Sequence, residues 1–132
     1  MKSQIVVDKK SQKTICTNFS NGKKHDFKLF KDSGVRWVKE IEGFVDSGYT
    51  GILKIQSNTQ LPKKRTKKKK LTKEEKQENR RIASERVTNE HAIGFLKRFK
   101  IISERYRNRR KRFGLRFNLI AGICNFELDL VA

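Results

Sequence analysis

Residues 44–52 read FVDSGYTGI, a stretch in which two apolar residues run directly into an acid and then into a turn. Phe44, Val45 and Asp46 predict a short strand, because Ser47 and Gly48 are residues that end strands and form turns. An acid at a strand end can be a turn former whose side chain binds backbone amides, or a metal ligand held on a rigid element. Asp46 by itself leaves both interpretations open.

The elements before this strand predict how it joins a sheet. Residues 3–8 (SQIVVD) and 14–19 (TICTNF) are rich in β-branched residues and flank a polar loop, which predicts a β-hairpin. Asp26 is suited to N-cap a short helix over residues 27–31, and residues 35–42 are compatible with further helix. Because a helix separates the hairpin from the next strand, that strand must cross over, which predicts an α/β fold with a mixed sheet.

Two long helices are predicted in the second half of the chain. Thr72 and Glu75 form the capping-box pattern T-x-x-E before a stretch with helical apolar periodicity. One helix is therefore expected from about residue 73 to residue 106, and a second from about residue 109 to residue 128. Charged and amide side chains interrupt the second helix, which excludes it as a membrane span.

Positive charge is concentrated in one part of the sequence. The chain has 33 Lys and Arg but 14 Asp and Glu, a net charge of +19, and residues 61–116 alone hold 22 bases and 6 acids. Residues 61–70 (LPKKRTKKKK) predict an exposed basic arm or edge strand, and residues 107–112 (RNRRKR) form a second run. Such a surface favours a polyanion, nucleic acid before membrane, although each run can also be ordinary solvated surface.

Glu90 is the second acid of interest, within RVTNEHAIGFLKRF at residues 86–99. On a continuous helix it would share a face with Arg86 and Lys97. Two carboxylates on rigid elements among bases suit metal-assisted phosphoryl transfer, because Mg²⁺ takes few carboxylates and keeps positions for phosphate oxygens. A Glu four residues after an Arg is also a common exposed helix pair, so this acid is equally ambiguous alone.

The sequence contains six ordered blocks that match a family pattern. They are GKKHDFKLF, VDSGYTGI, LPKK, LTKEEKxxN, SERVTNEHAIGFLKRFKI and RYRNRRKRF. Together they resemble the C-terminal part of bacterial insertion-sequence DDE transposases, in the group named after insertion sequence five, over about residues 3–128. The resemblance implies an RNase H-like fold that binds Mg²⁺ or Mn²⁺ through two Asp and one Glu, cuts transposon ends and joins them to target DNA.

The resemblance also assigns roles to residues of this sequence. Asp46 matches the second catalytic, metal-binding Asp and Glu90 the catalytic, metal-binding Glu, while Tyr49 and Gly51 belong to the same signature. The expected DNA-binding residues are the bases of the arm, those flanking Glu90 and those of the second run: Lys63, Lys64, Arg65, Arg86, Lys97, Arg107, Arg109 and Arg110.

The family's first catalytic Asp lies on a strand that precedes the hairpin. Asp8 is the nearest candidate, but an acid there would leave one strand before the first helix where the fold needs two, so Asp8 is interpreted as a loop residue. We therefore expect residues 1–132 to be a partial, truncated RNase H-like domain without its first strand, inactive alone. The chain would be a decayed remnant or a second reading frame, and the N-terminal transposase part or an intact transposase is a further expected partner.

Two other interpretations remain open. The basic region also fits a non-enzymatic nucleic-acid-binding protein, in which Glu90 would be dispensable, or a fragment that regulates an intact transposase. Cys16 and Cys124 are far apart, as are the two histidines, which argues against a zinc site and predicts free, buried thiols in a reducing compartment. Polar residues after Met1 argue against a signal peptide, so the expected location is the bacterial cytoplasm, in association with the nucleoid.

Overall fold

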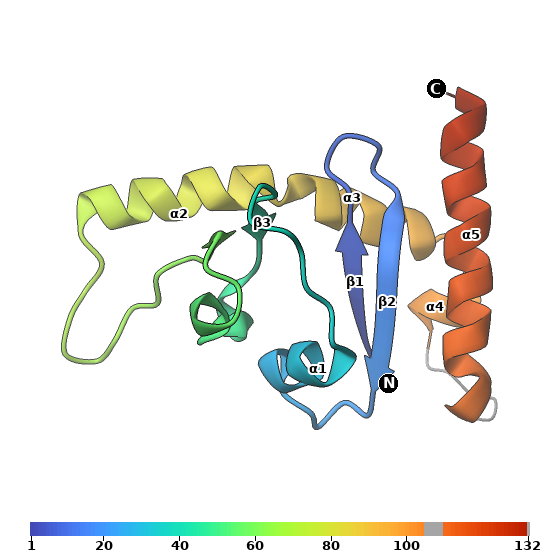
Figure 1. Ribbon diagram of the computed structural model, residues 1–132, viewed down its shortest axis with the longest axis horizontal. Helices are drawn as coiled ribbons and strands as arrows, with labels where there is room; N and C mark the ends of the chain where they lie inside the picture. The colour runs from blue at the N-terminus through green and yellow to red at the C-terminus, as the bar shows by residue number, and fades with distance from the viewer. Residues whose placement is uncertain (105–109, 132) are drawn as a thin grey trace. The chain divides into compact units, whose positions relative to one another are not determined.

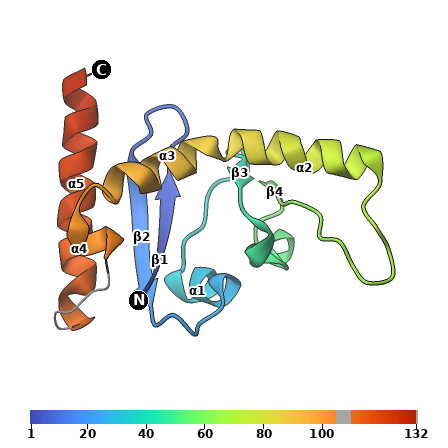
Figure 2. The same cartoon turned by 180° about the vertical axis from the view of Figure 1, so that it is seen from behind.

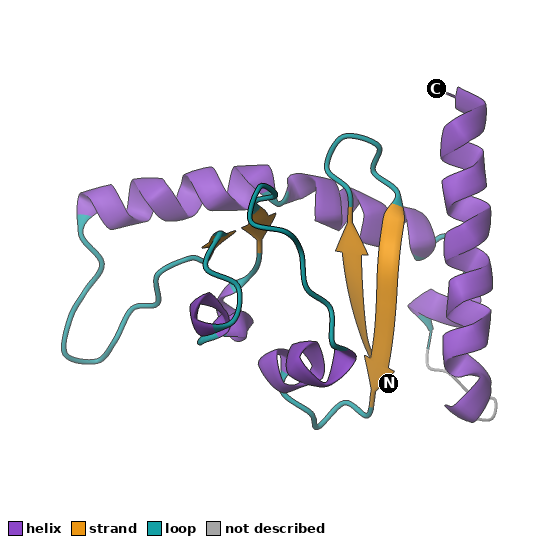
Figure 3. Ribbon diagram, in the orientation of Figure 1, coloured by secondary structure: helices purple, strands orange, loops and turns teal. Residues whose placement is uncertain are grey.

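The computed structural model describes residues 1–104 and 110–131, which form two compact units. The first unit comprises residues 1–24 and the described residues from 88 onward, and the second comprises residues 25–87. Helices and strands occur in both, so the expected α/β class is confirmed, and the order of elements agrees with a truncated RNase H-like fold (Figures 1 and 3).

The first unit is built on the predicted hairpin. Strand β1 (Lys2–Val7) pairs antiparallel with β2 (Thr14–Ser20), with Ile5 opposite Thr17. Asp8 begins the connecting loop, where its carboxylate accepts hydrogen bonds from the amide of Ser11 at 3.0 Å and the hydroxyl of Ser11 at 2.7 Å. These bonds lower the pKa of Asp8 and confirm that it is a loop residue.

Helix α5 (Phe113–Val131) lies beside β2 (Figures 1 and 2). It packs against the strand through one apolar stripe. Phe113, Phe117 and Cys124 are buried on that stripe, and the ring of Phe19 from β2 packs edge-on to Phe113 at 5.4 Å. The side-chain amide of Asn125 accepts from the N–H of Thr14 at 3.0 Å and donates to its carbonyl at 2.9 Å. Spacing of apolar residues by three and four therefore produces the helix and its contact with the sheet together.

The prediction of free, buried thiols is confirmed for Cys124, whereas Cys16 is free but only half-buried. Both cysteines are free, Cys124 buried in the core of the first unit and Cys16 half-buried. Burial raises the pKa of the Cys124 thiol, against a smaller lowering by the Arg98 guanidinium, 3.9 Å away.

The second unit begins with α1 (Asp26–Ser33) and contains a short parallel strand pair. Gly34, at φ 69°, ends α1 in the left-handed conformation that favours glycine. Strand β3 (Gly43–Phe44) pairs parallel with β4 (Thr59–Gln60), and the 3₁₀ helices Ser47–Tyr49 and Ile52–Lys54 lie between them. The described strands thus form a hairpin and a separate parallel pair, where one mixed sheet was predicted.

The segment at residues 35–42 is not helical, although helix was one interpretation of its sequence. Buried Gln56 pairs its side-chain amide with the backbone of Trp37, accepting from the N–H at 3.2 Å and donating to the carbonyl at 2.7 Å. Asn58 donates to the carbonyls of Val38 at 3.0 Å and Lys39 at 2.9 Å. The side chains of Gln56 and Asn58 satisfy backbone groups that would otherwise be paired within a helix. The segment at residues 35–42 can therefore be irregular without leaving these groups unpaired.

The prediction of one continuous helix over residues 73–106 is wrong. It is divided into α2 (Lys73–Glu85), α3 (Val87–Leu96) and α4 (Lys100–Ser103). At the first break the amide of Arg86 is shared between the carbonyls of Ile82 and Ala83, both at 3.1 Å, which tightens the last turn of α2. Capping at Thr72 and Glu75 is confirmed, whereas Asp26 is the first residue of α1 and His25 occupies the N-cap position.

Candidate metal and DNA site

Asp46 lies two residues beyond the end of β3, which covers Gly43–Phe44 and not residues 44–46 as predicted, and it caps the 3₁₀ helix Ser47–Tyr49. Its backbone is extended, at φ −84° and ψ 177°, and its Oδ1 accepts the N–H of Gly48 at 2.8 Å. The amide of Val45 donates to the carbonyl of Gln60 at 3.1 Å, which continues the pairing of β3 and β4 up to the acid. The turn-former interpretation is therefore correct, and it also holds the carboxylate on a fixed strand end with its side chain 45% exposed.

Arg86 is the charged neighbour of Asp46. Its Nη2 lies 3.9 Å from Asp46 Oδ2, and its side chain is 21% exposed, in the turn that joins α2 to α3. Among the described residues its buried Nε has no hydrogen-bond partner. A guanidinium at this distance offsets part of the negative charge of Asp46, whose side chain stays 45% exposed.

A second carboxylate, from Asp26, lies beside the same turn. A Cβ added to Gly48 would stand 2.8 Å from Asp26 Oδ2 and 3.0 Å from Asp46 Oδ1, so the two acids flank the space that this glycine leaves. The sequence predicted Asp26 only as a helix cap and gave no indication that its carboxylate lies near that of Asp46. Carboxylate oxygens are the donors that Mg²⁺ and Mn²⁺ prefer, so the donor chemistry fits these ions.

Two carboxylates are too few donors for a complete metal site. Among residues 1–104 and 110–131, no group of three or more His, Cys, Asp or Glu side chains is arranged to hold an ion. The pair Asp26 and Asp46 is therefore too small to form a metal site by itself.

Tyr49 follows Asp46 in the same turn, and its ring lies 6.2 Å from the ring of Phe30 in α1. Burial, and then the charges of Asp26 and Asp46, raise the pKa of Tyr49 to about 12, against a smaller lowering by Arg86. The Tyr49 phenol is therefore uncharged at neutral pH.

Titration of Tyr49 tests this electrostatic environment. With Tyr106 replaced by Phe, the remaining tyrosine is expected to ionise near pH 12, well above its ordinary value of 10.0, as followed by tyrosinate absorbance. Because the folded pKa is the higher one, the stabilisation is complete below pH 10 and is lost as the pH rises towards 12. Asp26→Asn in the same Tyr106→Phe protein is expected to move the midpoint down, whereas titration of Tyr49 at the ordinary value without that change would contradict the described environment.

Glu90 lies on α3 in the first unit, whereas Asp46 and Arg86 belong to the second. Its side chain is exposed in the first turn of α3, and Lys97 lies in the turn that follows this helix. The structure brings Asp46 and Arg86 together, and convergence of Glu90 with Asp46 stays a prediction. The division of the long helix means that Arg86, Glu90 and Lys97 do not share one continuous helix face.

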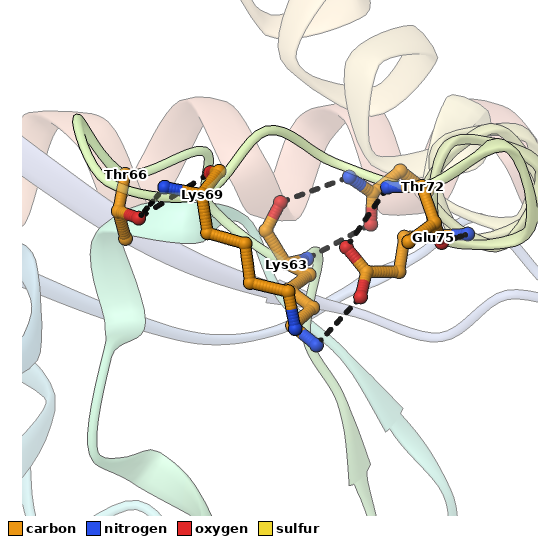
Figure 4. A network of polar contacts seen from close by, with 6 residues as sticks. Lys63, Thr66, Lys69, Thr72 and Glu75 are labelled. Atoms are coloured by element: carbon orange, nitrogen blue, oxygen red, sulfur yellow. Dashed lines mark hydrogen bonds and ion pairs between the residues drawn. The ribbon is translucent and has the colours of Figure 1, made fainter.

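The expected DNA-binding bases occupy different settings. Lys64 and Arg65 are exposed in the loop between β4 and α2, which is an arm without strand structure, as one interpretation predicted. The ammonium of Lys63 instead pairs with Glu75, 2.8 Å from its Oε1 (Figure 4). Arg107 and Arg109 lie outside the described residues, and Arg110 begins the 3₁₀ helix Arg110–Arg112.

The described helices include none with the length and apolar character needed to cross a membrane. No solved structure matches the chain. The chain is 47% identical, over 132 residues, to a probable transposase for insertion sequence element IS702 from Microchaete diplosiphon, covering 100% of this chain and 48% of that protein. It therefore spans about half the length of this curated relative. The family model of the DDE superfamily endonuclease matches residues 1–125, and we conclude that the chain belongs to this family.

Proposed function

We propose that the chain forms part of the catalytic domain of a transposase that cuts transposon ends and joins them to target DNA. Family membership supports this activity. The observation that carries the proposal is the Asp46 carboxylate, held at a strand end by its bond to Gly48 and partly open to solvent. Such an acid can accept a cation without a change in the surrounding backbone.

Asp46 and Glu90 are the proposed ligands of Mg²⁺ or Mn²⁺. Both side chains offer hard oxygen donors, and the family generally uses divalent metal ions. When bound, such ions stabilise the attacking and leaving oxygens of an in-line displacement at phosphorus. Within the chain, the Gly48 amide orients Asp46, and Arg86 offsets its charge until a cation binds.

The 132-residue chain is proposed to be inactive in cleavage when alone. Its described residues hold no group of three acidic or other ligating side chains, and the two-metal mechanism needs carboxylates that bridge and flank the ions. An N-terminal transposase part, or an intact transposase, would supply the missing carboxylate as a partner.

A nicking assay on DNA carrying an element end tests this proposal. With Mg²⁺ or Mn²⁺, the chain alone is expected to bind the DNA without cutting it, and cleavage is expected when a longer transposase supplies the missing part. Robust cleavage by the chain alone that is lost in Asp46→Asn would refute the proposed inactivity of the isolated chain. The same result would support Asp46 as a metal ligand. Cleavage that survives Asp46→Asn and Glu90→Gln would exclude both acids as ligands.

Binding to DNA is expected to weaken steeply as salt rises. Residues 61–116 carry 22 bases against 6 acids, and each phosphate that they neutralise contributes about 0.9 to the slope of log affinity against log salt. Filter binding or fluorescence anisotropy over a salt series measures this slope. Affinity that does not change with salt would exclude the basic surface as the contact and remove support for the non-enzymatic nucleic-acid-binding alternative as well.

A further inference from the structure

The basic arm is held at its base by Asn79 of α2. The side-chain oxygen of Asn79 accepts the N–H of Lys63 at 2.8 Å, and its nitrogen donates to the carbonyl of Lys63 at 2.9 Å. One half-buried amide therefore pairs both backbone groups of one residue. A side chain that makes both bonds fixes the position and the direction of the chain where the arm leaves the second unit.

Glu75 closes the arm from its other end. Its Oε1 lies 2.8 Å from the Lys63 ammonium, and its Oε2 accepts the N–H of Thr72 at 3.3 Å (Figure 4). The hydrogen bond from Lys63 is the main cause that lowers the pKa of Glu75, so the carboxylate stays charged at neutral pH. Lys63 and Thr72, nine positions apart in the sequence, are thus tied to one side chain, which closes the loop between them.

The tip of the arm is ordered by a turn of its own. The N–H of Thr66 donates to the carbonyl of Lys69 at 3.2 Å, and the N–H of Lys69 donates to the Thr66 hydroxyl at 3.0 Å (Figure 4). Loops rich in like charge ordinarily extend because their charges repel. Here the bonds at the base and the tip hold the cations together against that repulsion.

The closed arm forms an open concavity of about 460 Å³, lined by Arg65, Thr66, Lys67, Lys68 and Lys70. The lining has four cations, one hydroxyl and no acid. The volume is within the range of about 300–1,000 Å³ for ligand sites and exceeds the size of one phosphate group. A ligand with several adjacent negative charges is the chemistry that complements it.

We propose that this arm is a preformed site for successive phosphates of a nucleic-acid backbone and that Asn79 is its positioning residue. The proposal rests on the proposed function for DNA as the polyanion. It assigns Lys63 to the closure of the arm, whereas Arg65, Lys67, Lys68 and Lys70 face the ligand. Because the cations are already gathered, binding avoids part of the entropy cost of ordering a flexible arm.

Three variants of the full chain test the site and its positioning separately. Asn79→Ala removes the two hydrogen bonds between Asn79 and the backbone of Lys63, here called the Lys63–Asn79 clamp, without changing charge. Lys67→Ala/Lys68→Ala/Lys70→Ala removes cations from the concavity, and Gln77→Ala removes an exposed amide from the same helix. Each is measured for affinity to a DNA duplex over a salt series and for the rate of trypsin cleavage between residues 64 and 70. A poly-glutamate peptide of equal charge is the second probe.

Asn79→Ala is expected to speed cleavage of the arm about tenfold, because two hydrogen bonds that hold its base are removed. It should weaken DNA binding about three- to tenfold with an unchanged salt slope. The triple variant should lower the slope by about 0.9 for each phosphate that the arm no longer neutralises, and Gln77→Ala should change neither quantity.

Several results would overturn the inference. An unchanged slope in the triple variant, with tight binding by the parent chain, would exclude the arm as a phosphate site while leaving the proposed function intact. Faster cleavage of Asn79→Ala with unchanged affinity would reject the positioning role. Equal affinity for poly-glutamate would reject the assignment to nucleic acid, and no binding of DNA by the parent chain would remove the proposed function itself, whereas the cleavage rates would still report on the clamp.

Discussion

Replacing Glu90 by Gln is expected to lower the affinity of the chain for Mn²⁺ at least about tenfold, while leaving its affinity for DNA unchanged or slightly higher. An amide keeps the shape of the side chain but loses the negative charge that a hard cation requires. Even partners outside the first coordination shell commonly contribute about 10–100-fold to metal affinity, so loss of a direct ligand should exceed the lower value. Removing an acid from a basic surface lessens repulsion of phosphate, which gives the opposite sign for DNA.

Isothermal titration with Mn²⁺ and anisotropy with DNA measure these two quantities on the same protein. Asp46→Asn is expected to behave like Glu90→Gln, and Glu74→Gln, which changes an exposed acid of α2, serves as the control. If Glu90→Gln binds Mn²⁺ as well as the parent chain does, Glu90 is not a ligand. The non-enzymatic nucleic-acid-binding interpretation would then be the better account.

Phe117→Ala is expected to destabilise the first unit by about 3–5 kcal/mol, the usual cost of emptying an aromatic site in a core. Phe117 is 5% exposed, and its ring lies 5.1 Å from that of Phe19 and 5.9 Å from that of Phe113. Truncation removes both ring interactions and leaves a cavity between α5 and β2. In a small domain this is a large part of the total free energy of unfolding.

Leu119→Ala is the matched control for this change, because Leu119 lies on the same helix but is 60% exposed. Its effect on the free energy of unfolding is expected to stay within about 0.5 kcal/mol. Urea unfolding followed by circular dichroism measures both variants. Equal destabilisation by the two would contradict the packing of α5 against β2 through the Phe117 stripe.

Local patterns predicted those elements whose structure depends on neighbouring residues. The β-branched segments around a polar loop form the hairpin, and Thr72 with Glu75 begins α2 as a capping box. The acid at residue 46 lies just beyond a short strand and caps the following turn, as residue type alone suggested. The cap at Thr72 and the turn at Asp46 involve groups within three positions of one another, and the two hairpin strands are joined by one short loop, so the local sequence contains these signals.

Elements that depend on distant side chains could not be predicted in this way. The irregular segment at residues 35–42 is fixed by Gln56 and Asn58, about twenty positions further on. Strand β4 has two residues, too few for a periodic pattern, and the break at Arg86 has no Pro or Gly to mark it. Tertiary contacts outweigh local propensity at these places.

The same distinction applies to the candidate site. Asp46 was identifiable from its residue type and the family blocks, but its pairing with Arg86 and its proximity to Asp26 are properties of the folded second unit. The Lys63–Asn79 clamp was equally invisible, because a run of bases gives no indication of which side chain of α2 will hold it.

Sharing of one divalent ion by Asp46 and Glu90 is tested most directly by paramagnetic broadening of amide resonances during a Mn²⁺ titration. The prediction is that the amides of Gly48 and Glu90 broaden together, with one midpoint, and that either Asp46→Asn or Glu90→Gln abolishes the effect at both. Broadening at one amide alone, or at both with different midpoints that respond independently to the two substitutions, would contradict a shared ion.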